Sequence, residues 1–249
     1  MQCQTIEEVL NELDSIIASS VRDNNFMGIF AYVYRRTTAQ IKAEVEKSGF
    51  EDSARMQKLD VIFANFYLDA YQSYGNKGIV SKCWQTAFDA SHENITIVQH
   101  IMLGMNAHIN LDLGKAAALM MLDQDIRPLE NDFMKVNDIL ASLVDEMQTK
   151  LSKVSPLMFL LDWAGGRTDE NIINFSMTEA RKQAWRSAND IHALKGKEGI
   201  DKVNEIDQVV NLISDGIWRP DSGLIRRALK IIRYSEVKKV NRIIQGLES

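Results

Sequence analysis

The sequence predicts an all-α fold, a single bundle-like domain of many helices around a central helix that is buried and polar. Apolar residues recur at three- and four-residue intervals from end to end, which is the spacing of amphipathic helices. Three prolines and thirteen glycines are few for 249 residues, whereas a chain of many short strands needs more turn residues. The apolar share of 45% is ample for a large core.

The apolar pattern and its flanking residues place the helices along the chain. We expect helices over about residues 5–19, 26–47, 53–74, 79–90 and 94–121. Asn94 is the expected N-cap of the last of these. RPLENDF, residues 127–133, restarts the chain before an apolar stripe over 133–147, and further helices are expected from about residues 168, 199 and 221. Residues 1–249 are expected to form one domain, with 197–249 as the candidate for a C-terminal helical appendage.

Composition excludes some classes of function. A net charge of −5 argues against nucleic acid as the main partner, because phosphate binding needs a basic surface. Cys3 and Cys83 match no ligand spacing, and no signal peptide is visible, so a reduced, cytoplasmic protein is expected. Amides and histidines interrupt the longest uncharged run, residues 94–111, which favours a core helix over a membrane span.

The stretch QHIMLGMNAHINLDLG, residues 99–114, is an apolar helix that carries unusually many polar side chains. On a helical projection one face spans roughly 120° and holds His100, Gly104, His108 and Asp112. A second face, spanning roughly 40°, holds Gln99, Asn106 and Asn110. Six unpartnered polar groups would cost about 6–18 kcal/mol, comparable with the roughly 5–15 kcal/mol stability of a domain. Either other helices supply partners, or the helix lines a pocket or a bound ion.

A metal site is the most concrete of these alternatives. His108 and Asp112 are neighbours at i, i+4, and both residue types bind first-row metals. His100 lies near the same face, and Asp69 or Asp132 is expected to complete the site from another helix. Asp162, in an apolar setting, is a further candidate to complete or orient it. Zinc is the first candidate, because it lowers the pKa of bound water.

Two metal-free alternatives remain open. In the first, His108 acts as acid or base, polarised by Asp112, on an apolar substrate among the aromatic side chains. In the second, the polar side chains only pair with one another and fix the helix register, and the function is partner or small-ligand binding. A solvent-open cavity with converging polar groups would favour the enzyme.

The same stretch resembles a bacterial and fungal family of unknown function (DUF5995), together with ANFYLDAY upstream and DFMKVN, SPLMFLLD and ARKQAW downstream. The resemblance covers roughly residues 60–188 and implies a shared helical fold without a specific activity. The positions it marks are Gln99, His100, Asn106, His108, Asn110, Asp112, Asp132 and Asp162.

A shorter match concerns G-x-x-x-H-x-x-x-D, here Gly104, His108 and Asp112. It is similar to a zinc-ligand helix of bacterial phospholipase C and of single-strand-specific zinc nucleases, which are all-helical phosphodiesterases. This chain departs from their pattern because it continues LGKAAALMM and holds only four histidines. The similarity therefore implies at most a one- or two-metal site, in a hydrolase of esters or phosphoesters.

Overall fold

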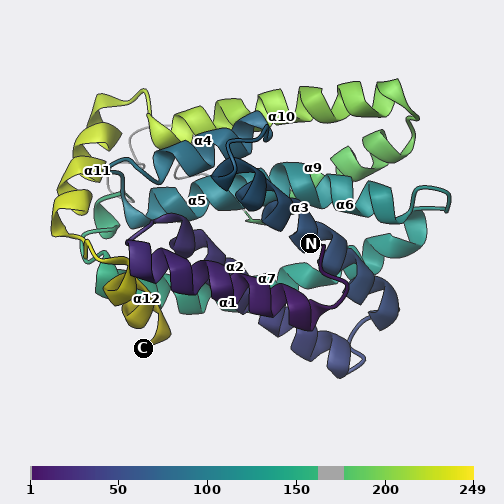
Figure 1. Ribbon diagram of the computed structural model, residues 1–249, viewed down its shortest axis with the longest axis horizontal. Helices are drawn as coiled ribbons and strands as arrows, with labels where there is room; N and C mark the ends of the chain where they lie inside the picture. The colour runs from purple at the N-terminus through teal and green to yellow at the C-terminus, as the bar shows by residue number, and fades with distance from the viewer. Residues whose placement is uncertain (1, 162–176) are drawn as a thin grey trace.

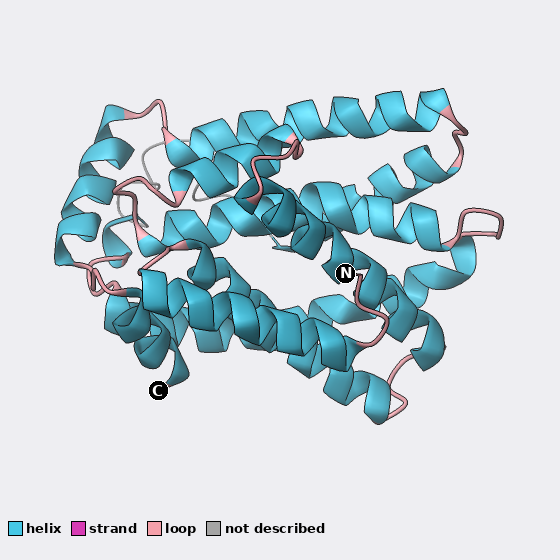
Figure 2. Ribbon diagram, viewed as in Figure 1, coloured by secondary structure: helices cyan, strands magenta, loops and turns pink. Residues whose placement is uncertain are grey.

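The computed structural model describes residues 2–161 and 177–249, and these residues form helices and no strand (Figure 2). The predicted all-α class is confirmed. The elements are α1 (Ile6–Asp23), α2 (Met27–Glu46), α3 (Ser53–Gly75), α4 (Lys82–Ala90), α5 (Ile97–Ala107), the π-helical turn η1 (His108–Asp112), α6 (Leu113–Met120), the 3₁₀ turn η2 (Arg127–Leu129), α7 (Glu130–Val154), α9 (Met177–His192), α10 (Lys197–Trp218), α11 (Gly223–Ser235) and α12 (Val240–Glu248).

Short polar side chains begin several helices. Thr5 accepts a hydrogen bond from the backbone N–H of Glu8 at the start of α1, and Asp52 accepts one from that of Arg55 at the start of α3. Helix α1 ends where Asn24 adopts a left-handed conformation with φ of 52°. The sequence therefore sets these ends locally.

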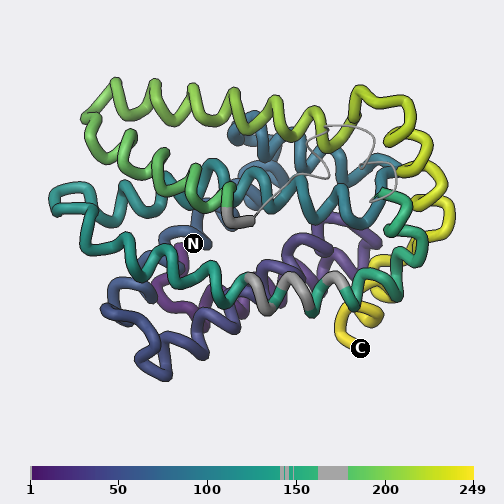
Figure 3. Tube along the Cα trace, turned by 180° about the vertical axis from the view of Figure 1, so that it is seen from behind, coloured from purple at the N-terminus to yellow at the C-terminus, as the bar shows by residue number. Residues whose placement is uncertain are grey.

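The α5–η1–α6 run crosses the middle of the molecule, and other helices surround it (Figure 1). Helix α10 packs on α4, α5 and α9, and α6 packs along α9 and α3. Helices α1 and α2 form a pair, and α2 contacts α5. The long helix α7 crosses the opposite side, seen in Figure 3, and contacts α9, α12 and α2. The polar stretch identified in the sequence is thus the central helix.

The central helix differs from its predicted form in two ways. Its N-cap is Thr96 rather than Asn94, because the side chains of Thr96 and Gln99 form a reciprocal capping box. It also contains a wider turn, in which the N–H of Leu113 donates to the carbonyl oxygen of His108. Such π-helical turns are frequent at functional sites.

The last helices share buried clusters with the first ones. Val210 of α10 lies in the cluster that contains Leu13 and Tyr67, and Ile243 of α12 lies in the one that contains Ile29. The division into one domain with 197–249 as an appendage stays a prediction. Within the described residues, none of the helices combines the length and the apolar content that crossing a bilayer requires.

Candidate functional site

A buried histidine–aspartate pair occupies the π-helical turn. Nδ1 of His108 lies 3.2 Å from Oδ2 of Asp112, and both side chains are buried. Trp84 Nε1 donates to the same oxygen at 2.8 Å, and Lys115 Nζ donates to the other at 3.2 Å. Burial alone would raise the pKa of Asp112, but Lys115, His108 and Trp84 outweigh it and hold that pKa below its ordinary value. Asp112 is therefore an ionised, fully held carboxylate.

The carboxylate fixes which nitrogen of His108 carries the proton. An ionised carboxylate only accepts hydrogen bonds, so we assign the proton to Nδ1 and the free lone pair to Nε2. Burial lowers the pKa of His108, and the opposing effect of Asp112 is smaller, so the ring is neutral at neutral pH. Nε2 is buried and has no hydrogen-bond partner among the described residues.

Aromatic side chains hold the His108 ring in place. The Phe63 ring is stacked on it, with centroids 3.6 Å apart and planes 8° apart. The Tyr34 ring meets it edge-on at 4.4 Å, and the Phe30 ring does so at 6.0 Å. These contacts and the bond to Asp112 together fix the direction of Nε2.

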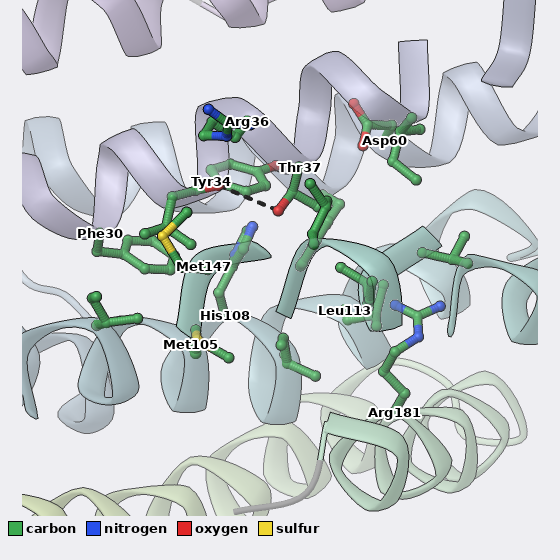
Figure 4. Close-up of a pocket in the computed structure, with 18 of the residues that line it drawn as sticks. Phe30, Tyr34, Arg36, Thr37, Asp60, Met105, His108, Leu113, Met147 and Arg181 are labelled. Carbon is green, nitrogen blue, oxygen red and sulfur yellow. Dashed lines mark hydrogen bonds between the residues drawn. The ribbon is translucent and has the colours of Figure 1, made fainter. Parts of the chain in front are cut away.

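His108 lines a cavity of about 220 Å³ between α2, α3, α5, α6 and α7 (Figure 4). Most of its wall is apolar and includes Ile41, Leu59, Met105, Leu113, Leu140 and Met147. Its polar or charged lining residues, among those described, are Tyr34, Arg36, Thr37, Asp60, His108 and Arg181. A mostly apolar cavity with a few polar groups is typical of small-molecule sites.

Asp60 and Arg181 are two buried, ionisable groups of this wall besides His108. Oδ2 of Asp60 has no hydrogen-bond partner within the described part of the chain, and burial raises the pKa of this carboxyl to about 7. Arg181 donates from Nη2 to the carbonyl oxygen of Phe133, while its Nε is unpartnered among those residues. Burial lowers the pKa of Arg181 to about 9.

The other polar face of the central helix is occupied by α10. Nε2 of Gln99 donates to the carbonyl oxygens of Ile217 at 2.7 Å and Trp218 at 3.2 Å. Nδ2 of Asn106 donates to Val210 O and Ser214 Oγ of α10, both at 2.9 Å, and its Oδ1 accepts from Asn110 at 2.8 Å. Gln99 and Asn106 thus dock α10 on the central helix, and Asn110 holds the Asn106 amide.

His100 lies apart from the pair, although the helical projection placed it near the same face. Its ring packs 4.8 Å from that of Phe26, and the Phe30 ring occupies the space beside Gly104. A Cβ at Gly104 would overlap Phe30, so the glycine admits the ring that separates the two histidines. Burial, with Arg233 nearby, lowers the pKa of His100 to about 3.

The carboxylates predicted to join the site lie elsewhere. Asp132 accepts from the backbone N–H groups of Glu51 and Asp52, at 2.7 and 3.0 Å, and its second oxygen also accepts from Arg55 at 3.0 Å. Asp69 accepts from Gln2 at 3.3 Å.

Asp162 falls outside the described residues. Of the predicted ligands, His100, His108, Asp112, Asp69 and Asp132, only the second lines the cavity. Residues 2–161 and 177–249 contain no group of three or more His, Cys, Asp or Glu side chains arranged to hold a metal.

Three charged residues of the cavity, Arg36, Asp60 and Arg181, were absent from the predicted site, and the sequence carries a signal for the last two. Arg181 precedes Ala184, Trp185 and Ala188 at helical spacing, so it stands in an apolar stripe. Asp60 likewise follows Met56 on the stripe of α3. A charge within an apolar stripe is the signal that would have found both.

The chain is similar to one described protein family. A model described as a family of unknown function (DUF5995) matches residues 6–220, which include the His108–Asp112 pair and every lining residue of the cavity. No curated protein and no solved structure matches the chain. The chain therefore belongs to this family of unknown function.

Proposed function

We propose that the protein binds a small, mostly apolar molecule in the cavity, and that a hydrogen-bond donor of this molecule meets Nε2 of His108. The observation that carries the proposal is the buried, unpartnered Nε2 of His108, a residue whose ring is held in a fixed direction and lines the cavity. A buried polar atom without a partner costs about 1–3 kcal/mol. A ligand hydroxyl or N–H would recover that cost.

The size and lining of the cavity favour an organic ligand. A dry apolar cavity of about 150 Å³ admits benzene. A cavity of about 220 Å³ therefore has room for an aromatic ring with a short chain, or for a short alkyl chain. One water molecule would satisfy Nε2 but would leave the apolar remainder of the cavity empty.

The same geometry supports a second candidate, proton abstraction from the bound molecule. A neutral histidine whose Nδ1–H is held by a buried carboxylate is the usual arrangement of a general base. His108 would remove a proton through Nε2, and Asp112 would stabilise the imidazolium that forms. This is the metal-free enzyme among the alternatives that the sequence left open.

The proposal is tested by identifying and then displacing the ligand. Native mass spectrometry of gently purified protein is expected to show a bound organic mass that denaturation releases. His108→Phe should abolish this mass, because the larger ring removes the acceptor and fills part of the cavity. His92→Phe, at an exposed histidine, is the matched control and should retain it. Ligand-free wild type that gains no thermal stability from any apolar donor would contradict the proposal.

A divalent metal, with zinc first, stays a separate prediction. Its test is elemental analysis of protein purified without chelator or histidine tag, beside a His108→Ala/Asp112→Ala variant. Near-stoichiometric metal that the variant loses would favour the metal-dependent hydrolase. The metal-free alternatives would be favoured if the wild type contained no metal and if added zinc and manganese left its melting temperature unchanged.

A further inference from the structure

Arg181 is a charged group of the cavity wall that forms no ion pair within residues 2–161 and 177–249. Its side chain extends from α9 toward the cavity, as Figure 4 shows, and the residue is 4% exposed. Its guanidinium lies 4.7 Å from the centroid of the Phe133 ring and donates to the Phe133 carbonyl oxygen. It forms no ion pair with any described carboxylate, and its Nε lacks a partner there.

This charge persists at neutral pH. Burial lowers the pKa of Arg181 only to about 9, so the guanidinium remains protonated at pH 7. A buried, unpaired charge is costly to a folded protein, and structures usually provide it with a partner. The other arginine of the wall, Arg36, has one, because Nη2 donates to Glu146 at 2.7 Å.

Asp60 does not fill this role. It projects from α3, on another side of the cavity from Arg181 in Figure 4, and no ion pair joins the two residues. Burial raises the pKa of Asp60 to about 7, so this carboxyl carries only part of its charge at neutral pH. The cavity therefore keeps a positive charge that the described residues of its wall do not balance.

Building on the proposed function, we propose that the bound molecule is an apolar carboxylic acid whose carboxylate pairs with Arg181. A guanidinium offers parallel N–H donors that match a carboxylate, and the unpartnered Nε belongs to that set. The apolar body of the acid would lie against the aliphatic and aromatic wall. A donor on that body would reach His108.

The test compares acids with alcohols of the same carbon skeleton. Octanoate is paired with octanol, and hydrocinnamate with the corresponding alcohol, and binding to ligand-free full-length protein is measured by calorimetry. Each acid is expected to bind roughly tenfold or more tightly than its alcohol, because its hydrogen bonds to Arg181 are charge-assisted. Arg181→Met should remove this preference and leave the alcohols bound, while Arg181→Lys should retain part of it.

Controls separate a lost charge from a lost fold. Lys182→Met removes a positive charge at the adjacent, exposed position and should leave the preference intact. Circular dichroism and thermal melting verify that each variant is folded. Arg181→Met is expected to melt at or above the wild-type temperature without ligand, because it removes an unbalanced charge.

Two outcomes overturn the inference, and they are distinct. If acids and alcohols bind equally, and His108→Phe weakens both, the cavity binds ligands but Arg181 does not select a carboxylate. If no acid or alcohol binds the wild type, and no released organic mass is found, the proposed function fails together with this inference.

Discussion

Nδ1 of His108 and Oδ2 of Asp112 lie 3.2 Å apart in one π-helical turn, and His108 is also a lining residue of an apolar cavity, with its Nε2 unpartnered among the described residues. The pair is therefore anchored on one side and open to a ligand on the other. Trp84 and Lys115 also donate hydrogen bonds to Asp112, so that its carboxylate is held in place from several sides. This division between a held carboxylate and a free nitrogen underlies the first prediction.

Asp112→Asn is expected to lower the free energy of unfolding by about 3 kcal/mol, the cost typical of breaking a buried ionic arrangement. The amide removes the charge that Lys115 and Trp84 meet, and its NH₂ group cannot accept from all the donors around it. Urea denaturation measures the change. Asp123→Asn, at an exposed position, should have little effect. Equal stability of the two variants would contradict the role assigned to Asp112.

Asn106→Leu tests the docking of α10 on the central helix. The substitution removes the donor to Val210 and Ser214 and leaves Asn110 without its acceptor, so a loss of about 2–3 kcal/mol is expected. Hydrogen exchange should accelerate in α10 more than in α1. Ligand binding by the variant should survive, because Asn106 is not part of the cavity wall. A selective loss of binding would instead return Asn106 to the site.

Local sequence patterns anticipated the contacts within the central helix. The i, i+4 spacing of His108 and Asp112 predicted their pairing, and the helical projection placed Asn106 and Asn110 together on another face. Both relationships depend only on helix geometry, which residue spacing determines.

Contacts between distant helices could not be predicted in the same way. Nothing near Gly104 indicates that Phe30, more than seventy residues earlier, fills the space beside it and separates His100 from His108. The position of Arg181 opposite α3 depends likewise on how α9 packs. The capping box at Thr96 was within reach of local reading, because Gln99 stands three residues later.

Gly104→Ala probes the separation of the two histidines. A methyl group there would overlap the Phe30 ring, which lies in a crowded aromatic cluster and has little room to move. Overpacking of this kind costs about 1–3 kcal/mol. Gly199→Ala, on α10, is the matched control and should be neutral or stabilising, because a methyl group there would make only ordinary van der Waals contact with Leu194. A thermal melt that falls only for Gly104→Ala is the expected result.

His100 should make the fold sensitive to acid. Its pKa is about 3 in the folded protein and 6.5 in its ordinary state, so the unfolded chain takes up a proton first as pH falls. Stability is then lost as pH falls from about 6.5 toward 3. His100→Phe should remove about 3 kcal/mol of the loss between pH 6.5 and pH 4. Denaturation at a series of pH values, with His92→Phe as control, measures it, and parallel curves for wild type and His100→Phe would contradict the burial effect.

Asp60 should act in the opposite direction on pH. Its pKa rises from 3.8 to about 7 on folding, so below pH 3.8 both states are protonated and the carboxyl contributes nothing. As pH rises from about 4 to 7, the unfolded chain ionises first and the folded state loses stability, by at most about 4 kcal/mol. Asp60→Asn has no carboxyl to ionise. Its free energy of unfolding should therefore rise relative to that of the ligand-free wild type across this interval, and the difference should persist above pH 7. Urea denaturation at pH 4 and pH 8 measures the gain, and Asp123→Asn should show none. An equal difference in the free energy of unfolding between Asp60→Asn and wild type at the two pH values would mean that Asp60 is ionised in the folded protein. The cavity would then hold the negative charge of Asp60 as well as the positive charge of Arg181.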